Sequence, residues 1–188
     1  MNTSAFDRLR LELSVNAKNG IDFICSATVV WLLLAYIWTL PYTAYNRSVL
    51  TFIAGSITLP LAFVLSKVFK TRWKTPDNPL EPLGLWLNFA QLFYFPMLVF
   101  VLLTSPDHFV MTYAIITGAH FFPYAWYYKS MPFAIMAGVI SAGAMLMGLT
   151  LAPADMYLLP LAMAGALAVL ALLLRWSWQT NARYLRGE

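Results

Sequence analysis

Apolar residues along this chain do not alternate with polar ones but run together in six long stretches. Each stretch holds about 20 residues, the length of a helix that crosses the ~30 Å hydrocarbon core of a bilayer. Unpaired backbone groups are costly in hydrocarbon, so stretches without strand-like alternation should cross it as helices. The predicted spans are residues 21–40, 49–68, 83–103, 109–128, 131–150 and 156–176.

The connections between these spans are short, so consecutive helices should run antiparallel. We therefore predict an all-α fold in which residues 1–188 form one transmembrane domain, an up-and-down bundle of six helices. Apolar positions recur at helical spacing within residues 1–20, which predicts a short interfacial helix on the membrane surface. Charged residues in this segment argue against a cleavable signal peptide, so the first span should be retained.

The composition is that of a membrane protein: 61% of the residues are hydrophobic and 11% are charged, against about 25% charged residues in soluble domains. Lysine and arginine mark the cytoplasmic side of such proteins. Of the 12 basic residues, 11 fall on one side of the predicted bundle and only Arg47 on the other. Both termini should therefore be cytoplasmic. The net charge of +4 is explained by loops facing anionic lipid and needs no nucleic-acid partner.

The fourth predicted span carries the most regular polar pattern. Its polar side chains recur every three or four residues and so share one helical face. They are Tyr113, Thr117, His120, Tyr124 and Tyr127. An imidazole at such a position can titrate near neutral pH, form hydrogen bonds or bind a metal. The alternative is that His120 is only a hydrogen-bonded interior residue.

The third span carries a second polar face, made by Asn88, Gln91 and Tyr94. Uncharged amides within a span are costly unless they find partners, so these side chains should point into the bundle. There they can either join helices through hydrogen bonds or contact a ligand.

The single carboxylate near the start of the first span, Asp22, has two interpretations. It can be a solvated residue at the positive end of the helix dipole, or it can face the bundle and pair with a polar group. With the predicted orientation, Asp22, Asn88, Gln91 and Tyr124 all lie in the cytoplasmic half. We therefore predict a polar vestibule open to the cytoplasm, with His120 at its floor.

The sequence does not carry the residues of a familiar catalytic or metal centre. It has one cysteine, Cys25, which excludes an intrachain disulfide, and His120 has only Asp22 as a further strong metal ligand nearby. There is no nucleophile motif, carboxylate pair or glycine-rich phosphate loop. We therefore expect no catalytic residues, no metal and no cofactor.

Five short pieces of the chain resemble a known family. They are Lys18-Asn19-Gly20-Ile21, Asn78-Pro79-Leu80, Gly118-Ala119-His120, Pro123-Tyr124 and Trp126-Tyr127-Tyr128-Lys129-Ser130. Together they cover roughly the first 130 residues and resemble an uncharacterised family of small bacterial six-span membrane proteins. The resemblance implies a multi-pass protein of the bacterial inner (plasma) membrane and brings no activity with it.

Three functions fit these patterns. The first is a non-enzymatic protein that binds or translocates a small solute or ion. Its predicted contacts are Asp22, Asn88, Gln91, Tyr94, Tyr113, Thr117, His120 and Tyr124. The second is a structural or assembly module whose polar groups only fix helix packing, and the third is a membrane-embedded enzyme acting on a lipid. Stripes of small residues can also serve a homo-oligomer.

Overall fold

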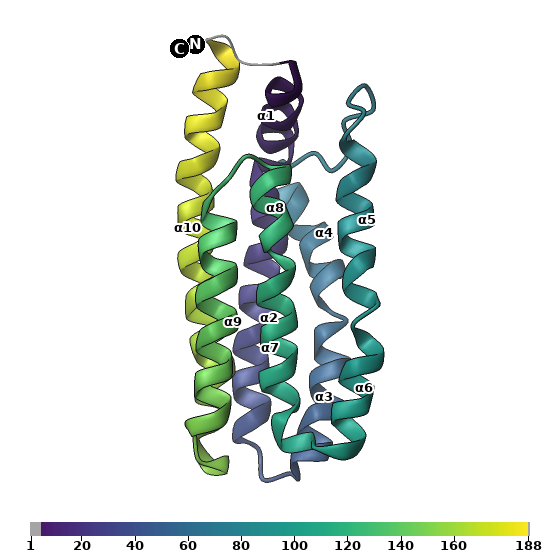
Figure 1. The fold of residues 1–188 in the computed structure, drawn as a ribbon, viewed down its shortest axis with the longest axis vertical. Coiled ribbons are helices and arrows are strands. Elements are labelled where there is room, and N and C mark those ends of the chain that lie inside the picture. Colours follow the sequence, from purple (N-terminus) through teal and green to yellow (C-terminus); the bar gives the residue numbers. More distant parts are fainter. Residues whose placement is uncertain (1–4, 188) are drawn as a thin grey trace.

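The computed structural model describes residues 5–187, and within them every regular element is a helix (Figure 1). This confirms the all-α class. The α-helices are α1 (Ala5–Ala17), α2 (Ile21–Thr39), α3 (Ala44–Gly55), α4 (Thr58–Phe69), α5 (Glu81–Leu92), α6 (Phe95–Thr104), α7 (Phe109–His120), α8 (Phe122–Tyr127), α9 (Pro132–Thr150) and α10 (Leu158–Arg186). Short 3₁₀ turns join some of them, at Lys18–Gly20, Pro106–His108 and Pro153–Asp155.

Several of these helices are long and apolar enough to cross a membrane, either alone or with the helix that continues them. Within residues 5–187 there are five such stretches: Ala5–Thr39, Ala44–Phe69, Glu81–Thr104, Pro132–Thr150 and Pro153–Arg186. They contain the predicted spans other than the fourth. That span corresponds to α7 and α8, which are less apolar because they hold His120 and a series of tyrosines.

Three of the predicted spans are not continuous helices. The helix is interrupted at residues 56–57 between α3 and α4, at 93–94 between α5 and α6, and at 121 between α7 and α8. A proline follows each interruption within three residues: Pro60, Pro96 and Pro123. Proline lacks an N–H group and its ring crowds the preceding turn, so the helix cannot run through regularly. The residues at the interruptions keep right-handed helical backbone angles, so each pair of short helices continues in roughly one direction.

Two predicted boundaries also move. The second span begins at Ala44 rather than 49, because the Thr43 side chain caps the helix by accepting a hydrogen bond from the Asn46 amide. The last helix continues to Arg186 rather than ending at 176, since its final turns pack against α1. The described part of the predicted N-terminal segment forms α1, and residues 1–4 lie outside the described part.

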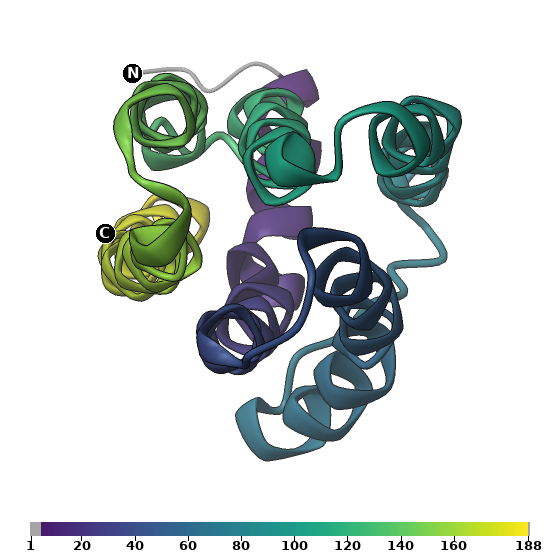
Figure 2. The same cartoon turned by 90° about the horizontal axis from the view of Figure 1, so that it is seen from below.

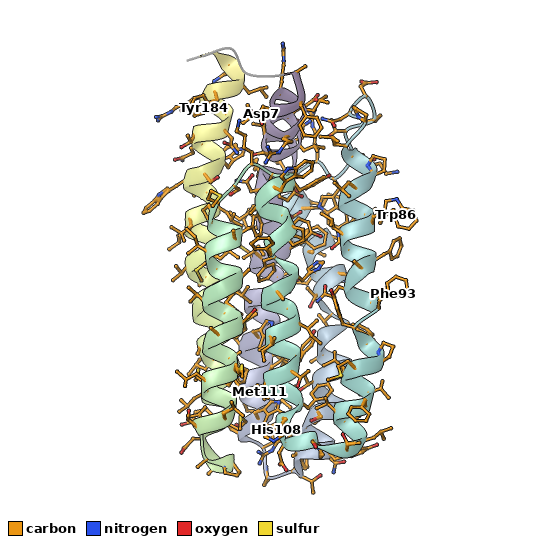
Figure 3. The ribbon with its side chains drawn as sticks, viewed as in Figure 1. Asp7, Trp86, Phe93, His108, Met111 and Tyr184 are labelled. Carbon is orange, nitrogen blue, oxygen red and sulfur yellow. The ribbon has the colours of Figure 1, made fainter. Side chains whose placement is uncertain are left out.

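The core of the bundle is built around α2, whose Trp31, Leu34 and Trp38 are buried. α10 and α4 pack along it, and α9 packs against α7 (Figures 1 and 2). By contrast, α5 stands at the edge and has no buried residue. Trp86 and Phe93 point away from the bundle on this side (Figure 3). The polar face of α5 therefore has few protein neighbours.

Candidate functional site

The site centres on His120, the last residue of α7, and on Tyr124 in α8. The interruption at Phe121 separates the two short helices but keeps their common face, so the two rings meet edge to face at 5.2 Å between centroids. His120 is half-buried and Tyr124 is buried. The Tyr124 ring also meets the ring of Tyr127 at 6.2 Å, so three members of the predicted polar face lie in contact.

Three polar groups near this point are not used in helix packing. Within residues 5–187, no hydrogen bond joins the His120 ring, the Tyr124 hydroxyl or the Gln91 amide to another residue. In the same range, no buried polar side-chain atom lacks a hydrogen-bond partner. The atoms of these three groups therefore border accessible space, because they would otherwise be buried and unpaired.

Gln91 and His120 lie at the same level along the bundle. The Tyr127 hydroxyl donates to the Glu81 carbonyl at 3.2 Å and sits beside Gly84, which fixes α8 against the start of α5. α5 and α8 run in opposite directions (Figure 1). Gln91 is seven residues after Gly84, and His120 is seven before Tyr127. Both helices advance by about 1.5 Å per residue, so the two side chains reach the same depth, near the interruptions at 93–94 and 121.

The predicted site residues Tyr113 and Thr117 hold α7 in place. The Thr117 hydroxyl donates to the Tyr113 carbonyl at 2.8 Å within the same helix. The Tyr113 ring stacks on Trp31 of α2 at 5.3 Å, and its hydroxyl fills the space left by Gly55 in α3. Tyr113 thus contacts α2 and α3, while Tyr127 on the same face contacts α5. His120, between them in sequence, faces the side of α7 toward these helices.

The prediction that Asn88 and Tyr94 point into the bundle was wrong. Asn88 is exposed, and its amide donates to the Gly84 carbonyl of its own helix at 2.9 Å. Tyr94 is 52% exposed. The less exposed side of α5 consists of Leu83, Gly84, Leu87 and Gln91, so only Gln91 of the three polar residues lies on it.

Asp22 is fully buried, so its interpretation as a solvated carboxylate was wrong. One oxygen, Oδ2, accepts hydrogen bonds from the Thr71 hydroxyl and the Trp73 indole, both at 2.6 Å. The other, Oδ1, accepts from the Phe23 amide at 3.1 Å. Both partners on Oδ2 belong to the connection between α4 and α5. Asp22 therefore fastens this loop to the start of α2 and does not stand at the mouth of a vestibule.

The structure contains a second polar cluster that the sequence did not predict. We call it the terminal network, and it consists of Ser14, Asn19 and Asn181. The Ser14 hydroxyl donates to the Asn19 side-chain oxygen at 2.6 Å, and Asn181 donates to Ser14 at 2.8 Å. Asn19 also donates to the Leu174 carbonyl at 3.1 Å. These bonds hold a turn in which Lys18 and Asn19 have positive φ angles of 47° and 55°. Such angles disfavour residues with a side chain, so the network stabilises a strained entry into α2.

Two ion pairs lie near the terminal network. Asp7 in α1 pairs with Lys129 at 2.8 Å and with Arg10 at 3.1 Å. The hydrogen bond from Lys129, together with the charges of Lys129 and Arg10, lowers the pKa of the Asp7 carboxyl below its ordinary value. Asn78 adds a further link, because its amide donates to the Glu12 carboxylate and the Leu9 carbonyl, each at 2.9 Å.

The described residues do not bring three His, Cys, Asp or Glu side chains together as metal ligands.

A family model matches residues 6–177 of the chain. The chain belongs to DUF7010, a family of unknown function. This confirms the expectation of an uncharacterised family. The DUF7010 match includes His120, Gln91 and Asp22 and ends before Asn181. Neither a curated protein nor a solved structure matches the chain.

Proposed function

We propose that this chain is a six-span protein of the bacterial inner membrane that binds or translocates a small solute or ion. The five long apolar stretches and the α7–α8 pair supply the six spans. α1 and the end of α10 lie at the same end of the bundle (Figure 1), where 11 of the 12 basic residues also fall. By the positive-inside rule, that end is cytoplasmic.

The observation that carries the solute-binding proposal is the set of unused polar groups at the level of the helix interruptions. His120, Tyr124 and Gln91 offer an imidazole, a hydroxyl and an amide that no described residue engages. The residues at the interruptions keep right-handed helical angles, and helices loosened in this way are tolerated in a membrane where neighbouring groups satisfy the freed backbone or a cavity lies beside them. Interrupted helices near mid-depth are also how many transporters form their substrate sites.

The same observation argues against a purely structural role for this face. Polar side chains that only fix helix packing do so by hydrogen bonding between helices. The terminal network behaves in this way, because Ser14 of α1 bonds both to Asn19 in the turn before α2 and to Asn181 of α10. His120 and Gln91 do not. The chain thus separates a polar cluster that holds the helices from one that is free to meet a solute.

Cysteine accessibility tests this proposal. The native cysteine is removed by Cys25→Ala, and His120→Cys or Gln91→Cys is then introduced. Membrane-impermeant thiosulfonate reagent should label both positions in inside-out vesicles and neither in right-side-out vesicles. Ala114→Cys, at a fully buried position of the same helix as His120, is the control that should stay unlabelled. Absence of labelling at both positions from the cytoplasmic side would rule out the vestibule.

Transport is tested separately in proteoliposomes. Sodium, potassium and choline chloride gradients are applied in turn, and the charge movement is recorded on a solid-supported membrane. Choline is included because tyrosine ring faces attract quaternary ammonium ions. A current that the His120→Ala variant lacks would establish translocation through this site, whereas equal currents in both proteins would exclude His120 from the pathway.

A further inference from the structure

A basic cavity of about 210 Å³ opens at the end of the bundle that carries the termini. It lies between the start of α2, the end of α4 and the last turns of α10. Its lining is Lys18, Ile21, Phe69, Arg175 and Trp178. The cavity thus combines two cations with an indole and two apolar walls, and it is distinct from the His120 site.

The groups in this cavity are held in place by the fold. The Lys18 ammonium donates to the Phe69 carbonyl at 2.7 Å and lies over the Trp178 ring at 5.2 Å. The Trp178 indole in turn donates to the Val15 carbonyl at 3.2 Å. Lys18 belongs to the strained turn that the terminal network stabilises. A backbone strain that is stabilised elsewhere is typical of positions where a side chain must be aimed.

No carboxylate lines this cavity. Asp22 is engaged by Thr71 and Trp73, and Glu12 accepts from Asn78. Within residues 5–187, the ion pairs all involve Asp7, which lies on α1 and faces Lys129 and Arg10. A neighbouring cavity on the other side of α4 adds Lys67, Arg72 and Lys74. The end of α4 is therefore flanked by two basic cavities, and no carboxylate among residues 5–187 lines either of them.

An apolar strip leads from the cavity along the outer face of α2. It starts at Ile21 and continues through Cys25, Val29 and Leu32, spaced by four, four and three residues. Val29 is 53% and Leu32 49% exposed. Figure 2 shows α2 between α10 and α4, and Ile21, the first residue of the strip, lines the cavity between these helices. The strip's length of about 16 Å matches one leaflet, half of the ~30 Å hydrocarbon core.

We propose that Lys18 and Arg175 bind the phosphate of an anionic glycerophospholipid whose acyl chain lies on the Ile21–Leu32 strip of α2. The two cations meet the phosphate, Trp178 lies at the level of the glycerol ester groups, and the strip covers the chain. The excess of unpaired cations in the two cavities selects a headgroup of net negative charge over a zwitterionic one. The site is independent of His120 and of any solute.

Lipid-dependent thermal stability tests this site. The purified protein in detergent is titrated with dioleoyl phosphatidylglycerol, and an apparent dissociation constant is taken from the rise in Tm. Arg175→Gln should raise this constant roughly fivefold, the effect of one basic charge near an anionic lipid surface. This variant is chosen because, within residues 5–187, no hydrogen bond or ion pair involves the Arg175 side chain. Arg175→Lys should restore most of the affinity.

Three comparisons decide the outcome. Arg183→Gln removes the same charge from the same helix outside the cavity and should change the constant less than twofold. Dioleoyl phosphatidylcholine should stabilise the protein far less than phosphatidylglycerol. Inorganic phosphate and glycerophosphoglycerol, at matched ionic strength, should neither stabilise it nor compete. If Arg175→Gln and Arg183→Gln lowered the affinity for phosphatidylglycerol equally, the binding would depend only on the general charge of the surface. Competition by free phosphate would show an anion site without a lipid, and either result would overturn the proposal.

Discussion

Asn181 donates a hydrogen bond of 2.8 Å to the hydroxyl of Ser14, joining the final turns of the last helix to the first. The same amide also donates to the Tyr128 carbonyl at 3.1 Å, at the end of α8. Replacing it leaves buried acceptors without a donor, which costs about 1–3 kcal/mol. We expect Asn181→Ala to lower the free energy of unfolding by this amount, measured by thermal or denaturant unfolding in detergent.

The matched control for this prediction is Gln179→Ala. Gln179 is exposed on the same helix, and surface substitutions of this kind usually change stability by less than about 0.5 kcal/mol. Similar losses for both variants would mean that the terminal network does not stabilise the fold.

Gly118 lies at a close approach between α7 and α9. A Cβ atom at this position would lie 2.5 Å from the side chain of Ile140, which is buried. We expect Gly118→Ala to destabilise the protein by about 1–3 kcal/mol, the usual cost of overpacking a core. Gly138→Ala on α9 is the control, because nothing lies within 4 Å of its Cβ position. It should be neutral or stabilising by up to about 1 kcal/mol, since alanine favours helix.

The overpacking in Gly118→Ala should be relieved in part by Ile140→Ala, which removes the Cγ2 atom that the new methyl group would meet. Non-additive stabilities in the double variant would place the clash between these two residues. Full additivity would place it elsewhere.

Asp22 holds the loop between α4 and α5 against the start of α2 by hydrogen bonds. Asp22→Asn removes the charge that Thr71 and Trp73 share, and hydrogen bonds to charged groups are worth about 1.5–3 kcal/mol. We expect trypsin to cleave after Arg72 or Lys74 at least about tenfold faster in this variant, since cleavage follows the population of the open loop. Asp77→Asn removes an exposed acid from the same loop and should leave the rate unchanged.

Asp7 should make the position of α1 pH-dependent. Its pKa is lowered in the folded protein, chiefly by the hydrogen bond from Lys129. A lowered carboxyl pKa contributes stability that is present above the unfolded-state value near 3.8 and is lost as the pH falls through the folded-state value. The wild type should therefore be more stable than Asp7→Asn at pH 7. The difference should shrink below pH ~4 and in high salt, and a difference that is constant across this range would contradict the assignment.

The sequence was sufficient for the helices but not for their interruptions. An apolar run of about 20 residues determines a helical span by itself. Whether a proline breaks that span depends on neighbours that can satisfy the freed carbonyl, and these belong to the tertiary structure. Pro60, Pro96 and Pro123 are visible in the sequence, but the extent to which each one loosens its helix is not.

The candidate site was likewise predictable only where local spacing determines it. The common face of His120 and Tyr124 follows from helical spacing alone, which is local information. The direction of Asn88 depended on where α5 packs, and α5 stands at the edge of the bundle. The partners of Asp22 come from a loop about 50 residues away, and those of Ser14 come from α10. No periodic pattern in the sequence encodes such pairings.

The three interruptions give the molecule two mechanically different halves. α2, α9 and α10 run without a break and pack together as a stiff column. The helix pairs α3–α4, α5–α6 and α7–α8 are each interrupted near the middle, at residues 56–57, 93–94 and 121. Bending at these interruptions would swing α4, α5 and α8 while the column and the opposite end stay fixed. The spacing of the helices beside His120 would then change without any helix sliding along the bundle axis.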